Sequence, residues 1–385
     1  MKAILFANTD WYLYNFRLSL AVALQRQGVE VLLLSPPGDY GEKLQALGLR
    51  WIAVPLQRRS LGPLRELRVV WWLWRLFRHE HPDLVHGFTI KCAVYASLAA
   101  WLAGVKASVN AVTGMGYVFT STDRRARLLR PLVRGVMRIA FHGRRKRLIL
   151  QNAADVTWFT EQGLADPDSV RLIASSGVDV SRFVPRLHDS SPLAPLRVIL
   201  AARILWDKGI GEFIAAARQL RAEGRHIHFH VAGMPDSGNP SSVPRSVIEA
   251  WVEEGTIEWL GHVDDMPTLF ASADVVVLPS YREGCPKSLI EAAACALPLI
   301  TTDVPGCNDV VTHNVNGLLV PVRDATALAQ AIARLADDRP FARRLGLAAR
   351  EHALHAYSEP VVLARTLDVY RELIPGFGTR DAERC

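Results

Sequence analysis

The chain has 385 residues, of which 50% are hydrophobic, 8% aromatic and 22% charged, a composition that excludes an intrinsically disordered protein. Its length predicts two domains, because a single hydrophobic core rarely grows beyond about 250 to 300 residues. No apolar run reaches the roughly 18 to 20 residues that span a bilayer, and Asp10 interrupts the start MKAILFANTD before a signal peptide could form. We therefore expect a cytoplasmic protein. Its five cysteines, an odd number with no Cys-x-x-Cys pair, argue against a disulfide framework and a zinc site.

Positive charge is concentrated in the first half of the chain. Residues 1–185 carry 25 basic and 13 acidic side chains, a net charge of +12, whereas residues 186–385 carry 20 and 25, a net charge of −5. Nine arginines and one lysine lie between Arg124 and Arg147 with no acid among them, and apolar side chains interrupt these cations. This pattern predicts a basic amphipathic helix that suits an anionic membrane surface, with a solvated charged face as the alternative. Nucleic acid is disfavoured, because the sequence contains no recognisable nucleic-acid module and its second half is acidic.

In chain order, short apolar runs alternate with segments of helical spacing, which predicts βαβ units with buried parallel sheets. In the first half, strands are expected at 3–7, 29–35, 84–86 and 107–111, and helices at 16–27, 64–78 and 93–103. A Ser- and Pro-containing segment at 185–195 predicts a linker. After it, strands are expected at 198–201, 227–232, 257–260, 275–278 and 299–301, and helices at 210–222, 325–335, 341–356 and 360–373.

The predicted fold class is therefore α/β, with two Rossmann-like doubly wound domains facing across a cleft. We place the first domain at residues 1–187, the second at residues 188–358, and a C-terminal helix and tail at residues 359–385. Doubly wound domains normally hold their ligand outside the carboxyl ends of the strands. Functional residues are therefore sought in the loops that follow predicted strands.

The segment SYREGCPKSLIEAAACALPLITTDV, residues 280–304, contains a loop and a helix that could hold a phosphate. The strand at 275–278 leads into this loop, and Pro286 suits the first position of the helix that follows. The positive end of such a helix presents backbone N–H groups that receive a phosphate without a metal. The N–H groups expected there belong to Gly284, Cys285, Lys287 and Ser288.

Two carboxylates and two cations belong to the same predicted edge. Glu283 precedes the helix and Glu291 lies on it, so both could point into one crevice. The alternatives are that Glu283 is only a charge at the helix end and that Glu291 is a solvated surface acid. Arg203 and Lys208 lie in the loop ARILWDKG after the first strand of the second domain, where Lys208 could also simply support the next helix. A guanidinium and an ammonium at that place would neutralise a diphosphate. Together these residues predict a site for a nucleotide-diphosphate sugar.

The segments EGCPKSLIEAAACALPLITTD and ARILWDKG resemble the signature of retaining family 4 glycosyltransferases, which have the GT-B fold, and the resemblance covers essentially the whole chain. FTIKCAVYASLAAWLAG and NAVTGMGYVF resemble the subgroup that extends sugars on undecaprenyl diphosphate for O-antigen, capsule or similar surface glycans. The resemblance implies transfer of a hexose or N-acetylhexosamine from a UDP-sugar, with GDP still open, to such a lipid-linked saccharide. It also implies that the closing helix at 360–373 packs on the first domain.

The resemblance gives the donor-side residues their expected roles. Arg203 and Lys208 would bind the donor diphosphate, Glu283 would contact hydroxyls of the donor sugar, and Glu291 would bind the ribose hydroxyls. Backbone amides of residues 284–288 would hold the sugar and phosphate. The base pocket would be lined by Gly233, His262 and Val263.

The acceptor-side candidates lie in the first domain. They are Asn8, Asp10, Thr89, Lys91, Thr113 and Gly114. His86, which ends the segment PDLVH, joins Glu283, Arg203 and Lys208 as a predicted catalytic residue, with a hydrogen-bonded structural histidine as the alternative. Lys91 could meet the acceptor diphosphate or lie along the start of its helix. Two positions depart from the family pattern. Phe88 stands where many members have a second histidine. The segment TGMG at 113–116 stands near the place where several relatives have a histidine of the catalytic cleft.

The mechanism expected from the family needs neither a metal nor another cofactor, since the sequence shows no Asp-x-Asp motif in a loop after a strand. Asp264 and Asp265 are better interpreted as a helix cap. The phosphate oxygen of the departing nucleotide would take the proton of the acceptor hydroxyl on the same face of the sugar, so the transfer would proceed with retention. The predicted partners are thus a nucleotide sugar, a polyprenyl-diphosphate-linked acceptor and the inner face of the cytoplasmic membrane. A glycosyltransferase with a soluble acceptor, a UDP-sugar 2-epimerase and a silent nucleotide-sugar-binding protein are the alternatives.

Overall fold

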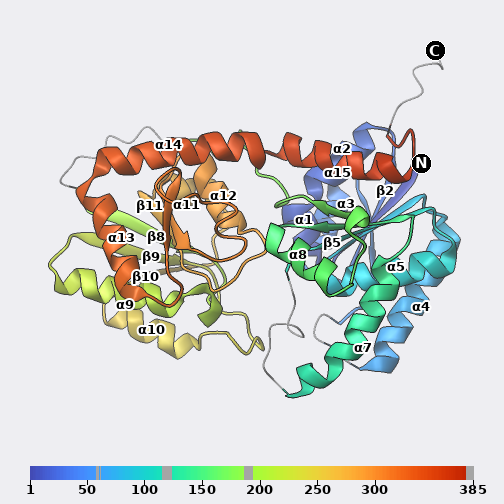
Figure 1. Cartoon of the computed structure of the whole chain (residues 1–385), viewed down its shortest axis with the longest axis horizontal. Helices are drawn as coiled ribbons and strands as arrows, with labels where there is room; N and C mark the ends of the chain where they lie inside the picture. The colour runs from blue at the N-terminus through green and yellow to red at the C-terminus, as the bar shows by residue number, and fades with distance from the viewer. Residues whose placement is uncertain (58–59, 61, 115–123, 186–193, 379–385) are drawn as a thin grey trace, which may run out of the picture. The chain divides into compact units, whose positions relative to one another are not determined.

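The computed structural model describes residues 1–57, 60, 62–114, 124–185 and 194–378 (Figure 1). The chain divides into two compact units. Unit 1 comprises Met1–Ser176 and Val362–Cys385, and unit 2 comprises Gly177–Val361. Each unit is built on one parallel sheet. Among the described helices, none is both long enough and apolar enough to cross a bilayer.

Unit 1 contains a seven-stranded sheet in the order β3-β2-β1-β4-β5-β6-β7, counted over the described residues. Its strands are β1 (Lys2–Phe6), β2 (Glu30–Ser35), β3 (Arg50–Ala53), β4 (Leu84–Phe88), β5 (Ala107–Val112), β6 (Lys146–Leu150) and β7 (Val170–Leu172). Its helices are α1 (Asp10–Phe16), α2 (Leu18–Arg26), α3 (Gly41–Ala46), α4 (Pro63–Glu80), α5 (Ile90–Ala103), α7 (Arg124–Phe141) and α8 (Ala153–Glu161). The strand order reverses between β1 and β4, and a doubly wound fold usually binds its ligand at such a switch point.

Strand β1 is buried on both faces, as expected of a covered parallel sheet. Because side chains alternate along a strand, Leu5 packs on one face of β1 and Ile4 on the other. The Leu5 face also receives Leu367 and Tyr370 from α15 (Glu359–Leu373) and Phe377 beyond it. The C-terminal segment is therefore part of the hydrophobic core of unit 1.

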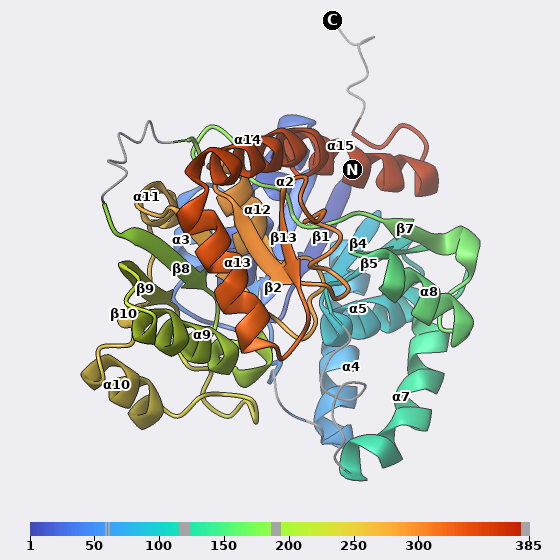
Figure 2. The ribbon, with the colours of Figure 1, turned by 60° about the vertical axis from the view of Figure 1, so that its left-hand side comes forward.

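Unit 2 contains a six-stranded sheet in the order β10-β9-β8-β11-β12-β13, again over the described residues. Its strands are β8 (Leu196–Ala201), β9 (Ile227–Ala232), β10 (Glu258–Gly261), β11 (Val275–Leu278), β12 (Leu299–Thr302) and β13 (Gly317–Val320). Its helices are α9 (Ile210–Ala222), α10 (Arg245–Glu253), α11 (Met266–Ala271), α12 (Lys287–Ala294), α13 (Ala325–Asp337) and α14 (Arg339–Ala356), and Figure 2 shows these elements from a second side. The change of direction in this sheet lies between β8 and β11.

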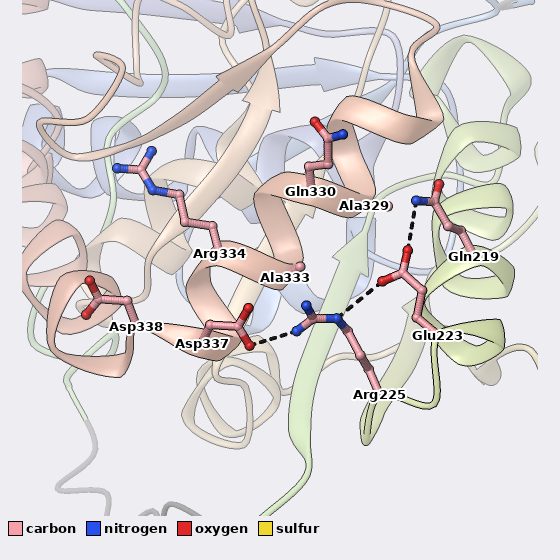
Figure 3. A pocket seen from close by; sticks show the side chains of 9 residues that line it. All are labelled: Gln219, Glu223, Arg225, Ala329, Gln330, Ala333, Arg334, Asp337 and Asp338. Atoms are coloured by element: carbon pink, nitrogen blue, oxygen red, sulfur yellow. Dashed lines mark hydrogen bonds and ion pairs between the residues drawn. The ribbon is translucent and has the colours of Figure 1, made fainter.

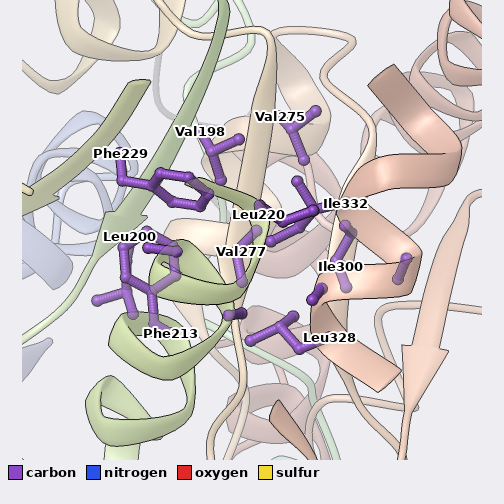
Figure 4. Close-up of a cluster of buried hydrophobic side chains, with 14 of the residues drawn as sticks. Val198, Leu200, Phe213, Leu220, Phe229, Val275, Val277, Ile300, Leu328 and Ile332 are labelled. Atoms are coloured by element: carbon purple, nitrogen blue, oxygen red, sulfur yellow. The ribbon is translucent and has the colours of Figure 1, made fainter. Parts of the chain in front are cut away.

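The core of unit 2 forms where α9 and α13 pack on one face of its sheet (Figure 4). Phe213 and Leu220 from α9 and Leu328 and Ile332 from α13 meet strand side chains such as Val277 there. These helices bury apolar residues at spacings of three and four, which is why their positions are visible in the sequence.

The predicted fold class is confirmed: both halves are doubly wound α/β units with parallel sheets. The predicted helix at 16–27 is incomplete, because the polar-looking loop after β1 is helical from Asp10. The short strands β3, β6, β7 and β13 were not predicted. The boundaries between units fall at 176/177 and 361/362. Most of the expected linker, residues 186–193, lies outside the described residues.

Candidate functional site

The donor-side candidates collect at the carboxyl edge of the unit 2 sheet. β8 and β11 are neighbouring parallel strands, so the loops that follow them emerge at the same edge. Arg203 and Lys208 lie in the loop after β8, and Glu283 lies in the loop after β11. This edge is also where the sheet changes direction, the usual ligand position in such folds.

Lys208 and Glu283 form an ion pair at this edge. The Lys208 ammonium contacts Oε1 of Glu283, and the Ser280 hydroxyl donates a hydrogen bond of 2.7 Å to the same oxygen. The two charged side chains are only 17% and 11% exposed. The ion pair is therefore partly shielded from solvent, and charges in such a site act more strongly on a ligand than they do in water.

Glycines allow the surrounding loops to approach closely. Gly209 has a φ of +72°, and a Cβ there would collide with the carbonyl of Pro279. Gly306 has a φ of +86°, and a Cβ there would collide with the carbonyl of Glu283. The Glu283 N–H also donates a hydrogen bond of 3.1 Å to the Pro305 carbonyl. The loop that carries Glu283 is therefore fixed between the segments after β8 and β12.

Helix α12 begins directly beyond Glu283. Pro286 is its N-cap residue and Lys287 is the first helical residue, so the helix starts one residue later than predicted. The proline ring offers no acceptor to cap the helix, and first-turn N–H groups have no acceptor within a helix. The residues expected to face the phosphate, Gly284, Cys285, Lys287 and Ser288, are all partly exposed. This arrangement has the geometry of an anion site at a positive helix end.

Glu291 lies one turn into α12, with its side chain 12% exposed. Burial raises the pKa of its carboxyl to about 7, while the Lys287 ammonium, 3.8 Å away, opposes the shift. The protonation of this carboxyl therefore changes near neutral pH. Ribose hydroxyls that donate hydrogen bonds would favour its charged form.

The pKa of Glu291 makes a testable contribution to stability. Because the folded-state pKa is above the unfolded value, the carboxyl favours the folded state at low pH, and this contribution is lost as the pH rises through 7. Between pH 5 and pH 8.5 we expect the unfolding free energy of wild type to fall by roughly 2 kcal/mol more than that of Glu291→Gln, which has no carboxyl to titrate. Urea unfolding of both proteins at the two pH values measures this. A stability difference that does not change with pH would contradict it.

The Arg203 side chain is held by a residue of a neighbouring loop. Its Nη1 donates a hydrogen bond of 2.8 Å to Oδ2 of Asp236, a residue in the loop after β9. Backbone bonds join the two loops, including Ile204 N–H to Met234 carbonyl at 3.0 Å and Trp206 N–H to Ser241 carbonyl at 2.7 Å. Sequence reasoning missed Asp236, although its position after a β-strand in an acidic, glycine-containing loop was a usable signal. One of the five guanidinium donors is thus committed to this contact.

The three residues expected to line a base pocket lie at the ends of β9 and β10. The Gly233 N–H donates to the Gly261 carbonyl at 2.7 Å, and the Gly233 carbonyl accepts from the Trp259 indole at 2.8 Å. His262 is exposed and contacts Asp264, and Val263 is partly buried. A Cβ on Gly233 would collide with the Ala202 carbonyl, so only glycine fits there. The predicted helix cap is confirmed at Asp265, which accepts the N–H of Thr268.

In unit 1, Asp10 is used by the protein itself. Its carboxylate is 5% exposed and accepts the N–H groups of Trp11 at 2.8 Å, Tyr40 at 2.7 Å and Gly41 at 3.0 Å. The side chain therefore joins the starts of α1 and α3 instead of extending toward a ligand. Asn8, two residues earlier, is partly exposed at the carboxyl edge of β1.

The structure places His86 in the core of unit 1, not at an edge. Its ring is 1% exposed, stacks 4.0 Å from the ring of Phe88, and shares a hydrogen bond of 2.6 Å between Nδ1 and the Tyr370 hydroxyl. Burial, and then the nearby Arg17 cation, lower its pKa well below the ordinary value. This geometry matches the alternative interpretation, a hydrogen-bonded structural histidine, and the catalytic role stays a prediction.

Lys91 is also committed elsewhere. Its ammonium contacts Glu66 at 3.0 Å and donates to the carbonyls of Gln57 at 2.8 Å and Ser60 at 2.9 Å. These contacts link α5 to α4 and to the segment before it, and the expected contact with an acceptor diphosphate stays a prediction.

Thr89, Thr113 and Gly114 do lie at the carboxyl edge of unit 1. Thr89 is the N-cap residue of α5 with a φ of +69°, an unusual conformation for a β-branched residue. Thr113 and Gly114 follow β5 and are partly exposed, whereas the rest of the TGMG segment lies outside the described residues.

A separate pocket lies between α9 and α13 of unit 2 (Figure 3). Arg225, which precedes β9, bridges Asp337 at 2.7 Å and Glu223 at 3.3 Å across it. Its position before a strand assigns it to the amino edge of the sheet, opposite the donor-side candidates. We therefore assign it no part in the site.

Sequence comparison identifies both halves of the chain. The family described as "Glycosyl transferase 4-like domain" matches residues 15–175, and the family described as "Glycosyl transferases group 1" matches residues 195–338. The N,N'-diacetylbacillosaminyl-diphospho-undecaprenol α-1,3-N-acetylgalactosaminyltransferase of Campylobacter jejuni is 27% identical over 373 residues, 94% of this chain and 96% of its own. The UDP-Gal:α-D-GlcNAc-diphosphoundecaprenol α-1,3-galactosyltransferase of Escherichia coli is 26% identical over 299 residues, 76% of each chain.

Solved structures show the same fold. Sucrose-phosphate synthase of Thermosynechococcus elongatus aligns over 97% of this chain and 99% of its own, with a TM-score of 0.78 and 21% identity. Anabaena HepE in complex with UDP and glucose aligns over 95% and 98%, with a TM-score of 0.78 and 18% identity. The protein is thus a glycosyltransferase with the GT-B fold. It belongs to the family 4 glycosyltransferases.

Proposed function

We propose that the protein transfers a hexose or N-acetylhexosamine from a UDP-sugar to an undecaprenyl-diphosphate-linked saccharide in the synthesis of a surface polysaccharide. The observation that carries the donor half is the Lys208–Glu283 pair beside the start of α12, where Pro286 is the N-cap residue. The names of the Campylobacter and Escherichia relatives support the acceptor half, since both act on diphospho-undecaprenol-linked sugars. The UDP in the HepE complex supports UDP as the nucleotide.

In this proposal the donor diphosphate lies between Lys208, Arg203 and the N–H groups at the start of α12. These groups stabilise the charge that develops on the leaving UDP, which is usually the largest contribution to such catalysis. Glu283, released from Lys208, accepts hydrogen bonds from the donor sugar, and Glu291 accepts them from the ribose. The bond from the anomeric carbon to UDP breaks, the acceptor oxygen bonds to that carbon, and its proton passes to the departing phosphate oxygen.

Mass spectrometry tests the proposal. The purified protein is incubated with a panel of UDP- and GDP-sugars and short-chain polyprenyl-diphosphate saccharides, and the products are weighed. A lipid-linked product longer by one sugar is expected with a UDP-sugar. Turnover only with a soluble acceptor, or epimerisation of the free nucleotide sugar, would contradict the proposal.

Chelation gives a further prediction. Because two cations and a helix end supply the positive charge at the diphosphate, we expect initial rates to stay within about twofold when EDTA is added. Loss of turnover that manganese or magnesium restores would show instead that a divalent ion holds the diphosphate.

The protein would meet its acceptor at an anionic membrane, and the basic stretch between Arg124 and Arg147 is the expected contact. Side chains of residues 124–129 lie outside the described residues. Further along, Arg138 donates to the carbonyls of Gly163 and Gln162, and Arg147 pairs with Glu372 at 2.9 Å. Arg144 and Arg145 are exposed.

We expect Arg144→Ser with Arg145→Ser to weaken sedimentation with phosphatidylglycerol-containing vesicles about tenfold or more, at roughly 1 kcal/mol per cation. Arg343→Ser with Arg344→Ser, two exposed arginines of unit 2, is the matched control. Equal binding by the two variants would remove the basic stretch from the docking contact.

A further inference from the structure

Helix α4 exposes three large apolar side chains on one face. Leu64 is 75% exposed, Leu67 64% and Trp71 53%. Their spacing of three and four residues places them side by side along the helix. The opposite face packs Val69, Leu73 and other apolar residues against the sheet, so the core already has its own stripe. A second apolar face on a helix that is packed in a domain calls for another partner.

The same exposed face is basic. Its exposed arginines are Arg65, Arg68, Arg75 and Arg78. The Arg75 guanidinium lies 5.0 Å over the ring of Trp71, so cation and aromatic ring are neighbours on the surface.

The two acids of this helix do not offset the charge of that face. Glu80, its last residue, is buried and pairs with Arg50 at 2.6 Å. Glu66 is turned toward α5, where it pairs with Lys91 at 3.0 Å and accepts the Tyr95 hydroxyl at 2.6 Å. Its side chain is 17% exposed. The outward face of α4 therefore combines apolar and cationic groups with no exposed acid among its described residues.

Neighbouring helices extend this surface. α5 packs against both α4 and α7, and both views show α4 and α7 reaching beyond the sheet of unit 1 (Figures 1 and 2). α7 exposes Leu132 by 66% and Ile139 by 60%, seven residues apart and hence on one face. α5 exposes Trp101 by 65%.

We propose that the outward face of α4 docks on an anionic lipid bilayer, with Leu64, Leu67 and Trp71 entering the boundary between headgroups and acyl chains. The inference rests on the proposed function, in which the acceptor is a membrane lipid. Arginines beside these side chains can extend their charges to the headgroups while their methylene groups lie against lipid. Charge complementarity favours this occupant, because four exposed arginines with no exposed acid among the residues of α4 match an anionic surface.

Vesicle binding of the full chain tests this inference. The variant L64S/L67S/W71S is compared with V252S/V315S/L347S, which removes three apolar side chains of unit 2 that are 41%, 58% and 56% exposed. Flotation with phosphatidylcholine–phosphatidylglycerol vesicles is measured at low salt and at 0.5 M salt, because the higher salt screens the contacts between exposed charges. Thermal unfolding and UDP binding of each variant check that the fold is intact.

The α4 variant is expected to bind vesicles at least about tenfold more weakly, and the unit 2 variant as wild type. Wild-type binding should fall at 0.5 M salt but persist in part, and bromine-labelled lipids should quench less fluorescence in W71F than in wild type. Equal vesicle binding by both triple variants would overturn the proposal, as would a wild-type dimer that the α4 variant converts to monomer. Vesicle binding without any sugar transfer would leave this inference standing and contradict the proposed function.

Discussion

Replacing Lys208 with alanine is expected to lower kcat/KM for sugar transfer by about 100- to 1,000-fold. The ammonium is the most enclosed cation at the proposed diphosphate position, 17% exposed and held by Glu283. Removal of one group that stabilises developing charge in a partly dry site costs about 2.7 to 4 kcal/mol of transition-state stabilisation. Initial rates with a UDP-sugar and a lipid-linked acceptor measure the effect. Lys43→Ala, which removes an exposed lysine of unit 1, is the control and should keep wild-type rates.

A structural effect of the same substitution can be separated from a catalytic one. Lys208→Ala leaves Glu283 partly buried beside Ser280 without its cation, so some loss of stability is expected. Glu283→Gln in the same background relieves that charge. UDP binding separates the two roles, because Glu283 is proposed to contact the donor sugar and not UDP. If the double variant recovers wild-type stability but binds UDP more weakly than wild type, Lys208 acts on the substrate. Recovery of UDP affinity together with stability would show that the lysine is structural.

Replacing Tyr370 with alanine is expected to lower the free energy of unfolding of unit 1 by about 3 to 5 kcal/mol, as for other large buried aromatic side chains. The ring is fully buried between β4 and the C-terminal segment, with its centroid 5.3 Å from that of Phe377. Tyr370→Phe keeps the ring but leaves His86 Nδ1 without its hydroxyl, and about 1 to 3 kcal/mol is expected for that buried group.

Urea unfolding measures these changes, with hydrogen exchange of β4 amides used to identify the transition of unit 1. Arg371→Ala, next in sequence but exposed and paired with the exposed Asp368, is the control and should change stability by less than about 1 kcal/mol. A Tyr370→Ala protein as stable as this control would show that α15 does not complete the core of unit 1.

Much of the fold is visible in the sequence because buried parallel strands are continuous apolar runs. The runs at 3–7 and 29–35 coincide with β1 and β2, since both faces of those strands are covered. β3 at the sheet edge has a pattern of half-exposed residues, and it carries no such run. The helical start at Asp10 was hidden because Thr9 and Asp10 resemble a turn, whereas here they cap α1.

The donor edge was predictable for a related reason. Loops that follow neighbouring parallel strands must share an edge, so Lys208 and Glu283 could be expected near one another without any contact being known. The partner of Arg203 could not be expected in this way. Asp236 comes from a loop whose path depends on backbone bonds to the segment after β8, and local sequence patterns do not specify those bonds.

In unit 1 the side-chain partners of two candidate residues could not be predicted from the sequence. His86 and Lys91 stand close to the end of a strand, which suggested contacts with a ligand. Their actual partners, Tyr370 and Glu66, belong to other helices that the sequence does not place beside β4 and α5. Burial of His86 and the ion pair of Lys91 are properties of tertiary packing, so they appear only once the units are folded.

A crystal structure of the protein with UDP would locate the donor site. We expect both phosphates at the carboxyl edge of the unit 2 sheet, within hydrogen-bond distance of the Lys208 ammonium and of N–H groups at the start of α12, with the ribose near Glu291. Phosphates bound at any other place, or held through a divalent ion away from Lys208, would contradict it.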